Sequence, residues 1–307
     1  RLLQSELTQN QIFTEIKQEY EELRISHAAR QKDKNYLSIA QAREKSSGID
    51  WTGFKSCQPS FLGVKYFQDY SLEEIAKYID WTPFFSTWGL TGKYPAIFDN
   101  KIVGQEAKRL FEDAQQQLQR IIDGKLLRAN AVIGMWEAYA NMDDVIVKTP
   151  DGEQMNLLQL RQQGQKADKL PNFCLADYIA PEETQKKDYI GGFAVTTGIG
   201  IEALLEECKA QNDDYNYIMI QAVADRLAEA FAELMHEKVR RDIWGYETNP
   251  KQTVEELIKE KYRGIRPAPG YPACPDHTEK EKLFHLLDAN RLGIHLTESY
   301  AMHPASA

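Results

Sequence analysis

An arginine held in a proline-rich segment is the clearest chemical signal in this sequence. The segment from Tyr262 to Lys280 reads Tyr-Arg-Gly-Ile-Arg-Pro-Ala-Pro-Gly-Tyr-Pro-Ala-Cys-Pro-Asp-His-Thr-Glu-Lys. Proline fixes φ and removes an amide donor, whereas Gly264 and Gly270 permit turns that other residues resist. The segment is therefore predicted to be a stiff, extended surface loop with unpaired carbonyls facing outward. Arg266, which directly precedes the first proline, offers a planar fork that suits a carboxylate or a phosphate.

Two acidic residues are further candidates for binding a polar ligand. Asp80 lies between Ile79 and Trp81, where an unpaired charge is costly unless something polar is bound there. A capping-box pattern that begins at Ser71 predicts a short helix that ends near this aspartate. Glu229 lies in a predicted helix, on a face that also carries Asp225, Glu233 and His236. A solvated helix face is the alternative explanation for Glu229, as a plain connection between helices is for the loop.

Periodicity predicts an α+β fold, with mixed helices around a mainly antiparallel twisted sheet in a single large domain. Helical patterns cover residues 5–34, 103–124, 201–210, 215–242 and 254–261, and a last helix begins near Thr278. Strand-like runs cover residues 131–139, 145–148, 154–160, 192–197 and 293–302. Asp151-Gly152 predicts a tight turn, so the strands on either side of it should be antiparallel. The sparse apolar stripe of the first helix makes residues 1–40 an N-terminal helical arm and leaves residues 41–307 as the domain.

Composition excludes several classes of protein. The formal net charge is −9, and basic residues are interspersed with acidic ones, which argues against a nucleic-acid partner. No apolar run approaches the length of a membrane span, so a soluble protein with no membrane association is expected. The cysteines show no metal-ligand or disulfide spacing, so we expect no metal and a reducing, cytoplasmic location. These cysteines are Cys57, Cys174, Cys208 and Cys274.

Four blocks of this sequence resemble one known domain. The run from Arg266 to Lys280 closely resembles the S-adenosylmethionine-binding loop of the C-terminal activation domain of cobalamin-dependent methionine synthase. All four blocks occur along the chain in the same order as in that family. The other three are residues 78–85 with 93–95 (Tyr-Ile-Asp-Trp-Thr-Pro-Phe-Phe and Lys-Tyr-Pro), residues 228–233 with 244–246 (Ala-Glu-Ala-Phe-Ala-Glu and Trp-Gly-Tyr), and residues 296–299 (Leu-Thr-Glu-Ser).

The resemblance implies a function within a larger methyltransferase. The domain would bind S-adenosylmethionine and present its methyl group for reductive methylation of cob(II)alamin, which reactivates the enzyme. The cobalamin would be held by another domain of the parent enzyme, and a flavodoxin or a similar reductant would supply the electron. Because the cobalt is the nucleophile, no catalytic residue is expected in this chain, and the isolated domain is not expected to be catalytic.

The resemblance also assigns the ligand-binding residues. The matching positions are Asp80, Glu229, Arg266, Ala268, Gly270 and Tyr271. The ligand needs a cation for its carboxylate, acidic groups and carbonyls for its ammonium and ribose, and aromatic faces for its purine and sulfonium. The family continues beyond the block at residues 296–299 into a segment rich in Gly and Tyr, so the domain is expected to be C-terminally truncated relative to the family.

Two other classes of function stay open on the sequence alone. Gly198-Ile-Gly-Ile-Glu-Ala203 matches a dinucleotide-binding fingerprint and would suit a nicotinamide-dependent oxidoreductase. A second strand ending in an acidic residue should follow about twenty residues later, but the helix predicted over 215–242 occupies that place. The remaining class is a non-catalytic interaction module, which binding of S-adenosylmethionine would exclude.

Overall fold

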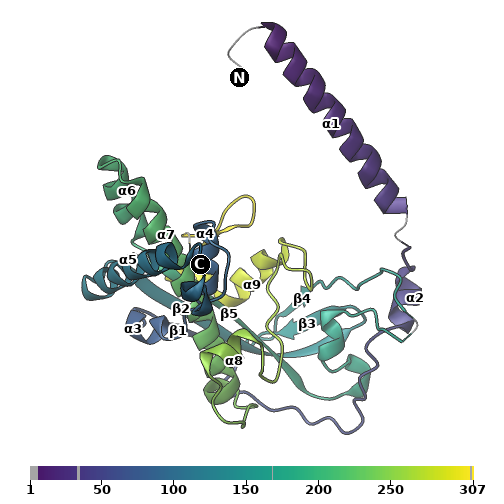
Figure 1. Cartoon of the computed structure of the whole chain (residues 1–307). Coiled ribbons are helices and arrows are strands. Elements are labelled where there is room, and N and C mark those ends of the chain that lie inside the picture. The colour runs from purple at the N-terminus through teal and green to yellow at the C-terminus, as the bar shows by residue number, and fades with distance from the viewer. Residues whose placement is uncertain (1–5, 33–34, 168, 305) are drawn as a thin grey trace.

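The computed structural model describes residues 6–32, 35–167, 169–304 and 306–307. An antiparallel sheet lies between helices in a single domain, which confirms the predicted α+β class (Figure 1). The α-helices are α1 Glu6–Lys32, α2 Ile39–Glu44, α3 Leu72–Ala76, α4 Thr82–Thr87, α5 Gly104–Asp123, α6 Ile201–Ala210, α7 Asp214–Lys238, α8 Val254–Ile258 and α9 Glu279–Leu287. Short 3₁₀ turns are η1 Ala96–Asp99, η2 Leu175–Tyr178, η3 Glu182–Thr184 and η5 Ala289–Leu292, and η4 Val239–Ile243 is a π-helical extension of α7.

One long strand organises the main sheet. The strands are β1 Gly63–Phe67, β2 Arg128–Asn141, β3 Asp144–Lys148, β4 Gln154–Leu157 and β5 Asp188–Ile199. β5 pairs with one edge of β2, while β1 and β3 share the other edge, and β4 pairs with β3. All these pairs are antiparallel, as the turn at Asp151-Gly152 predicted for β3 and β4.

Side chains of β2 alternate between two hydrophobic cores. Ala131, Ile133 and Met135 belong to one core, whereas Val132 and Trp136 belong to the other. This period of two is what a strand buried on both faces requires. The first core is filled by α3, α4, α5, α6 and α7, and the second by α9 and the η2 and η5 turns. α7 therefore covers one face of the sheet. The side of α7 that faces away from the sheet carries residues that contact the loop after α8.

Several elements differ from the sequence-based prediction. β1 was not predicted, because its five residues lie inside an aromatic stretch with no clear alternation. The run over 293–302 forms only two paired dipeptides, β6 His295–Leu296 and β7 Met302–His303. The box expected at Thr278 does not form, because the Thr278 hydroxyl donates to Asp276 instead. Ser71 does cap α3 by accepting from the Glu74 amide.

The glycine pattern at 198–200 is explained by a turn between β5 and α6. Gly200 has φ +99°, and a Cβ at this position would lie 2.9 Å from the carbonyl oxygen of Leu126. A left-handed conformation and a close backbone contact therefore account for this glycine without a nucleotide.

α1 extends away from the rest of the molecule, whereas the segment that follows it is tied to the sheet side (Figure 1). Leu37 N donates to Gln163 O at 2.8 Å, and Asn172 N donates to Lys45 O at 2.7 Å. No helix within the described ranges has both the length and the apolar character needed to cross a bilayer.

Candidate functional site

The Arg266 loop connects α8 to α9, and its arginine reaches α7. The Arg266 guanidinium donates through Nη2 to Oε1 of Glu233 in a short ion pair. The side chains are 25% and 17% exposed, so the pair lies in a mainly protein environment. Burial raises the pKa of Glu233, and the charge of Arg266 opposes that rise. The sequence pattern placed Glu233 on the polar face of its helix but gave it no role in the site.

Only one of the possible contacts between these two groups is made. An arginine and a carboxylate can pair side by side through two nitrogens and two oxygens. Here Nη1 of Arg266 and Oε2 of Glu233 are both buried and have no hydrogen-bond partner in the part of the chain that the structure describes. A buried polar atom left in this state costs about 1–3 kcal/mol. The ion pair therefore keeps one free donor and one free acceptor, shielded from solvent.

A second arginine behind this pair is fully enclosed. Arg240 donates from Nε to Glu247 Oε2 at 2.8 Å, and its guanidinium stacks on the Tyr262 ring at 4.1 Å. Its Nη1 lies 2.7 Å from Nδ1 of His236. Because arginine has no acceptor, Nδ1 must accept, and the ring proton of His236 is on Nε2. The four side chains fix the end of α7 against the segment that leads into the loop.

His236 is a neutral side chain within this cluster. Burial, together with the positive charges of Arg240 and Arg266, lowers its pKa to about 3. The sequence pattern placed His236 on an outward face of the helix, but it is only 4% exposed. It is buried because the loop after α8 covers this part of α7, with Tyr262 packed edge-on against the imidazole.

Two glycines give the loop its shape. Gly264 has φ +105°, and a Cβ there would lie 2.7 Å from the Tyr246 hydroxyl oxygen. Gly270 has φ +102°, and a Cβ there would lie 2.3 Å from the ring of His277. Both positions therefore require glycine for conformation and for space.

The tip of the loop is closed by its own hydrogen bonds. Gly270 N donates to Cys274 O at 2.8 Å, and the carbonyl of Ala268 accepts from Tyr271 N and from Cys274 Sγ. The expectation of outward, unpaired carbonyls was therefore wrong for Ala268 and Cys274. The Tyr271 ring at the tip is 63% exposed. An exposed ring at this place is available to a flat ligand group.

The segment that carries Asp80 also contacts α7. Asp80 is half-buried, and its Oδ1 accepts from the Thr82 amide at 2.9 Å at the start of α4. Two residues earlier, the Tyr78 hydroxyl donates to Glu237 Oε2 at 2.5 Å. Glu237 is one helical turn beyond Glu233, so the Asp80 segment and the Arg266 loop reach neighbouring turns of the same helix.

Glu229 is exposed on α7, one turn before Glu233. Its negative charge adds to the rise in the pKa of Glu233, which places the two carboxylates near each other. The structure thus brings Arg266 and Glu229 to adjacent turns of α7. Asp225, Glu229, Glu233 and Glu237 recur every four residues, and this spacing is a sequence signal that could have identified Glu233.

A hollow of about 220 Å³ lies elsewhere on α7. It is lined by Thr87, Ile218, Gln221, Ala222, Asp225 and Ser306. None of the six predicted ligand-binding residues lines it. The polar groups of the candidate site are instead those around the Arg266–Glu233 pair.

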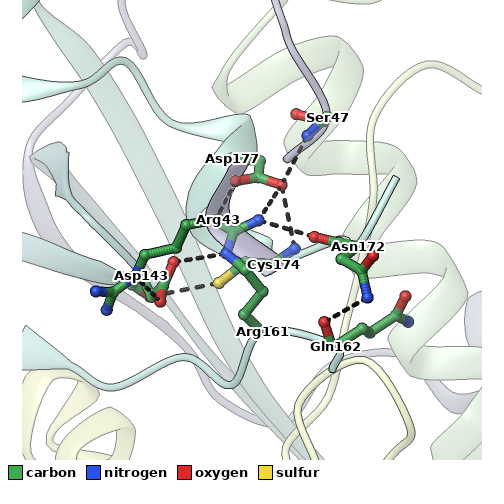
Figure 2. Close-up of polar contacts among 8 residues, drawn as sticks. All are labelled: Arg43, Ser47, Asp143, Arg161, Gln162, Asn172, Cys174 and Asp177. Atoms are coloured by element: carbon green, nitrogen blue, oxygen red, sulfur yellow. Dashed lines mark hydrogen bonds and ion pairs between the residues drawn. The ribbon is translucent and has the colours of Figure 1, made fainter. Parts of the chain in front are cut away.

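A separate buried ionic cluster fixes the segment after α1 to the sheet (Figure 2). Arg161 donates from Nε to Asp143 at 2.7 Å and from Nη2 to Asp177 at 2.6 Å, and its side chain is 3% exposed. Arg43 on α2 binds the other oxygen of Asp143 at 2.7 Å. Burial alone lowers the pKa of Arg161, but the two carboxylates outweigh it and raise the pKa. With every charge paired, this cluster has a structural role.

Comparison with known proteins identifies relatives of this chain. The family model described as "Vitamin B12 dependent methionine synthase, activation domain" matches residues 71–307. Among solved structures, the crystal structure of the MetH reactivation domain bound to AdoHcy is similar, with 45% sequence identity and a TM-score of 0.85. The similarity covers 88% of this chain and 84% of that chain.

Proposed function

Because the chain belongs to the family of activation domains of vitamin B12-dependent methionine synthases, we propose that it binds S-adenosylmethionine and presents the methyl group for reductive methylation of cob(II)alamin. The similar MetH domain is bound to AdoHcy, which is S-adenosylmethionine without the transferred methyl group. A dinucleotide-binding role is not favoured, because Gly200 is explained by the turn into α6.

The buried, unpaired Nη1 of Arg266 is the observation that carries the proposal. A ligand carboxylate supplies the acceptor that this donor lacks. The exposed Tyr271 ring offers an aromatic face, and the carboxylates of Asp80 and Glu229 offer acceptors for ammonium or hydroxyl groups. In this proposal Ala268 and Gly270 shape the loop backbone around the ligand.

Each partner has a separate task in this scheme. The ligand supplies an electrophilic methyl group on its sulfonium. The residues of this chain bind and orient that ligand, so no catalytic base is needed here. Cobalamin belongs to another domain of the parent enzyme, which docks on this one, and a flavodoxin or a similar protein supplies the electron. Four free cysteines suit a reducing cytoplasm.

We also place the start of the ligand-binding domain near residue 41, with residues 1–40 as an arm toward the rest of the enzyme. The direction of α1 supports the arm (Figure 1). The hydrogen bonds between residues 35–45 and the loop at 163–172 attach the base of that arm to the domain.

Calorimetric titration of the chain with S-adenosylmethionine tests the proposed function. Arg266→Ala should weaken binding by roughly tenfold or more, because a charge-assisted contact contributes about 1.5–3 kcal/mol. Arg266→Lys should restore only part of the affinity, since it keeps the charge and loses the planar fork.

Arg263→Ala is the matched control, because Arg263 lies in the same loop and is exposed. It should bind like the wild type. No binding by the wild-type chain would refute the proposed function. Equal losses at Arg263 and Arg266 would remove Arg266 from the site and leave only a general charge effect.

A further inference from the structure

The Arg266–Glu233 pair has the charge pattern that complements an α-amino acid. The zwitterionic end of an amino acid carries one carboxylate and one ammonium on the same carbon. The pair offers one buried donor, Nη1 of Arg266, and one buried acceptor, Oε2 of Glu233, and neither atom has a partner among the described residues. A carboxylate and an ammonium together would satisfy both atoms.

The neighbouring Arg240 and His236 contact each other and Glu247, although Arg240 Nη2 is a further buried donor without a partner among the described residues. Arg240 is paired with Glu247 at 2.8 Å, and His236 accepts from Arg240 through Nδ1 as a neutral ring. The charges that face Glu233 are then those of Arg266, Arg240 and Glu229. The positive charge of Arg266 and the negative charge of Glu233 sum to zero, which matches a ligand end whose own two charges cancel.

We propose that Glu233 is a ligand-binding residue that accepts from the α-ammonium group of the ligand, while Arg266 binds the α-carboxylate. This deepens the proposed function and rests on it. Glu233 also holds the guanidinium of Arg266 through the Nη2 contact. The pair therefore selects ligands with an intact amino-acid end, whereas the adenosine portion is bound elsewhere in the site.

Entry of the ligand requires a small movement of the loop. Nη1 and Oε2 are both shielded from solvent in the structure, so the side chains around them must shift to admit two new groups. Pro267 and Ala268, which follow Arg266, are exposed, and the required shift is proposed to take place there.

Three ligands and three variants separate this proposal from a purely structural role. The ligands are S-adenosylmethionine, decarboxylated S-adenosylmethionine, which keeps the amine, and 5′-methylthioadenosine, which lacks the whole amino-acid end. The variants are Glu233→Gln, Arg266→Ala and, as a matched control, Glu206→Gln at an exposed position on α6. Each is titrated by calorimetry in the 307-residue chain, after its thermal midpoint has been measured.

We expect Glu233→Gln to weaken S-adenosylmethionine and its decarboxylated form by about tenfold or more, and to leave 5′-methylthioadenosine unchanged. Arg266→Ala should weaken only S-adenosylmethionine, because the other two ligands lack the carboxylate. Glu206→Gln should change none of the three affinities. Glu233→Asp keeps the charge on a shorter side chain and should give losses smaller than those of Glu233→Gln. It also serves as the test should Glu233→Gln fail to fold.

The outcomes distinguish a failure of the Glu233 proposal from a failure of the proposed function. Unchanged binding of the decarboxylated ligand by Glu233→Gln, with weaker binding of the parent ligand, would show that Glu233 only positions Arg266 and would overturn the ammonium contact. A wild type that binds S-adenosylmethionine together with a Glu233→Gln variant of equal affinity would overturn the inference alone. A wild type that binds none of the ligands would overturn the proposed function and, with it, this inference.

Discussion

Asp80 combines a local hydrogen bond with a proposed role in binding. Its Oδ1 accepts from the Thr82 amide, which satisfies an otherwise free donor at the first residue of α4. An asparagine can make the same contact through its own oxygen, but it carries no charge. The two roles can therefore be separated by substitution.

Asp80→Asn should weaken S-adenosylmethionine binding with little change in stability, because the contact to Thr82 is kept and the charge is lost. Asp80→Ala should also destabilise the fold by about 1 kcal/mol, the usual net cost of losing one hydrogen bond. Titration calorimetry and urea unfolding measure the two effects. An Asp80→Asn variant with wild-type affinity and reduced stability would show that Asp80 is a structural residue.

His236 gives the fold a specific sensitivity to acid. Its pKa is about 3 in the folded protein and near 6.5 in an unfolded chain, so the unfolded state binds the proton first. The stability that depends on neutral His236 is present above about pH 6.5 and is lost as the pH falls toward 3, by at most about 1.4 kcal/mol per pH unit.

His236→Gln should remove this contribution while keeping an acceptor for Arg240. The wild type should lose stability relative to the variant between about pH 7 and pH 5, as measured by urea unfolding at each pH. Because both proteins share all other titrating groups, the difference reports His236. Parallel stability curves would mean that His236 can be protonated in the folded state.

At the scale of elements, the sequence predicted those helices and strands whose apolar residues recur at a regular spacing. α5 and α7 were predicted nearly to their ends, because long amphipathic patterns identify helices well. The central strands β2 and β5 extend beyond the predicted runs, since their ends carry polar residues that only pairing explains. The Arg266 loop was identified from its prolines and from the family resemblance, and its place beside Glu233 depends on how α7 packs against the chain after α8.

The Arg161 cluster shows what local patterns cannot predict. Its members come from α2, the turn between β2 and β3, the loop after β4 and the η2 turn, and they share no spacing in the sequence (Figure 2). Only the tertiary fold brings Arg43, Asp143, Arg161 and Asp177 together. No sequence pattern predicts such a cluster, although it fixes the segment that follows α1.

Arg43 and Arg161 form a matched pair for measuring this cluster. Each donates from Nε to Asp143 at 2.7 Å, but their side chains are 42% and 3% exposed. Arg161→Met should destabilise the protein by about 3–5 kcal/mol, because it leaves buried carboxylates without their partner. Arg43→Met should cost no more than about 1 kcal/mol. Urea unfolding of both variants provides the measurement, and equal costs would contradict a dominant effect of burial.

On the scale of the whole molecule, the proposed function requires this chain to hold a ligand for a reaction with another domain. The sheet and α7 pack in one core, and the loop after α8 places Arg266 against α7. The proposed arm, α1, extends away from the rest of the molecule (Figure 1). In the proposed function the nucleophile is cobalt on another domain, so the two reacting groups meet only in the parent enzyme.

This arrangement predicts that the isolated chain binds S-adenosylmethionine without consuming it. With the ligand and a reductant, it should release no S-adenosylhomocysteine, as followed by chromatography, because no nucleophile is present. The same domain within its parent enzyme should support the return of cob(II)alamin to methylcobalamin, followed by absorbance, and Arg266→Ala should slow that return at low ligand concentration. The slowing should disappear at saturating ligand if Arg266 acts only in binding. Release of S-adenosylhomocysteine by the isolated chain with an ordinary nucleophile would show a self-sufficient methyltransferase, and the Arg266–Glu233 pair would then need a catalytic base nearby.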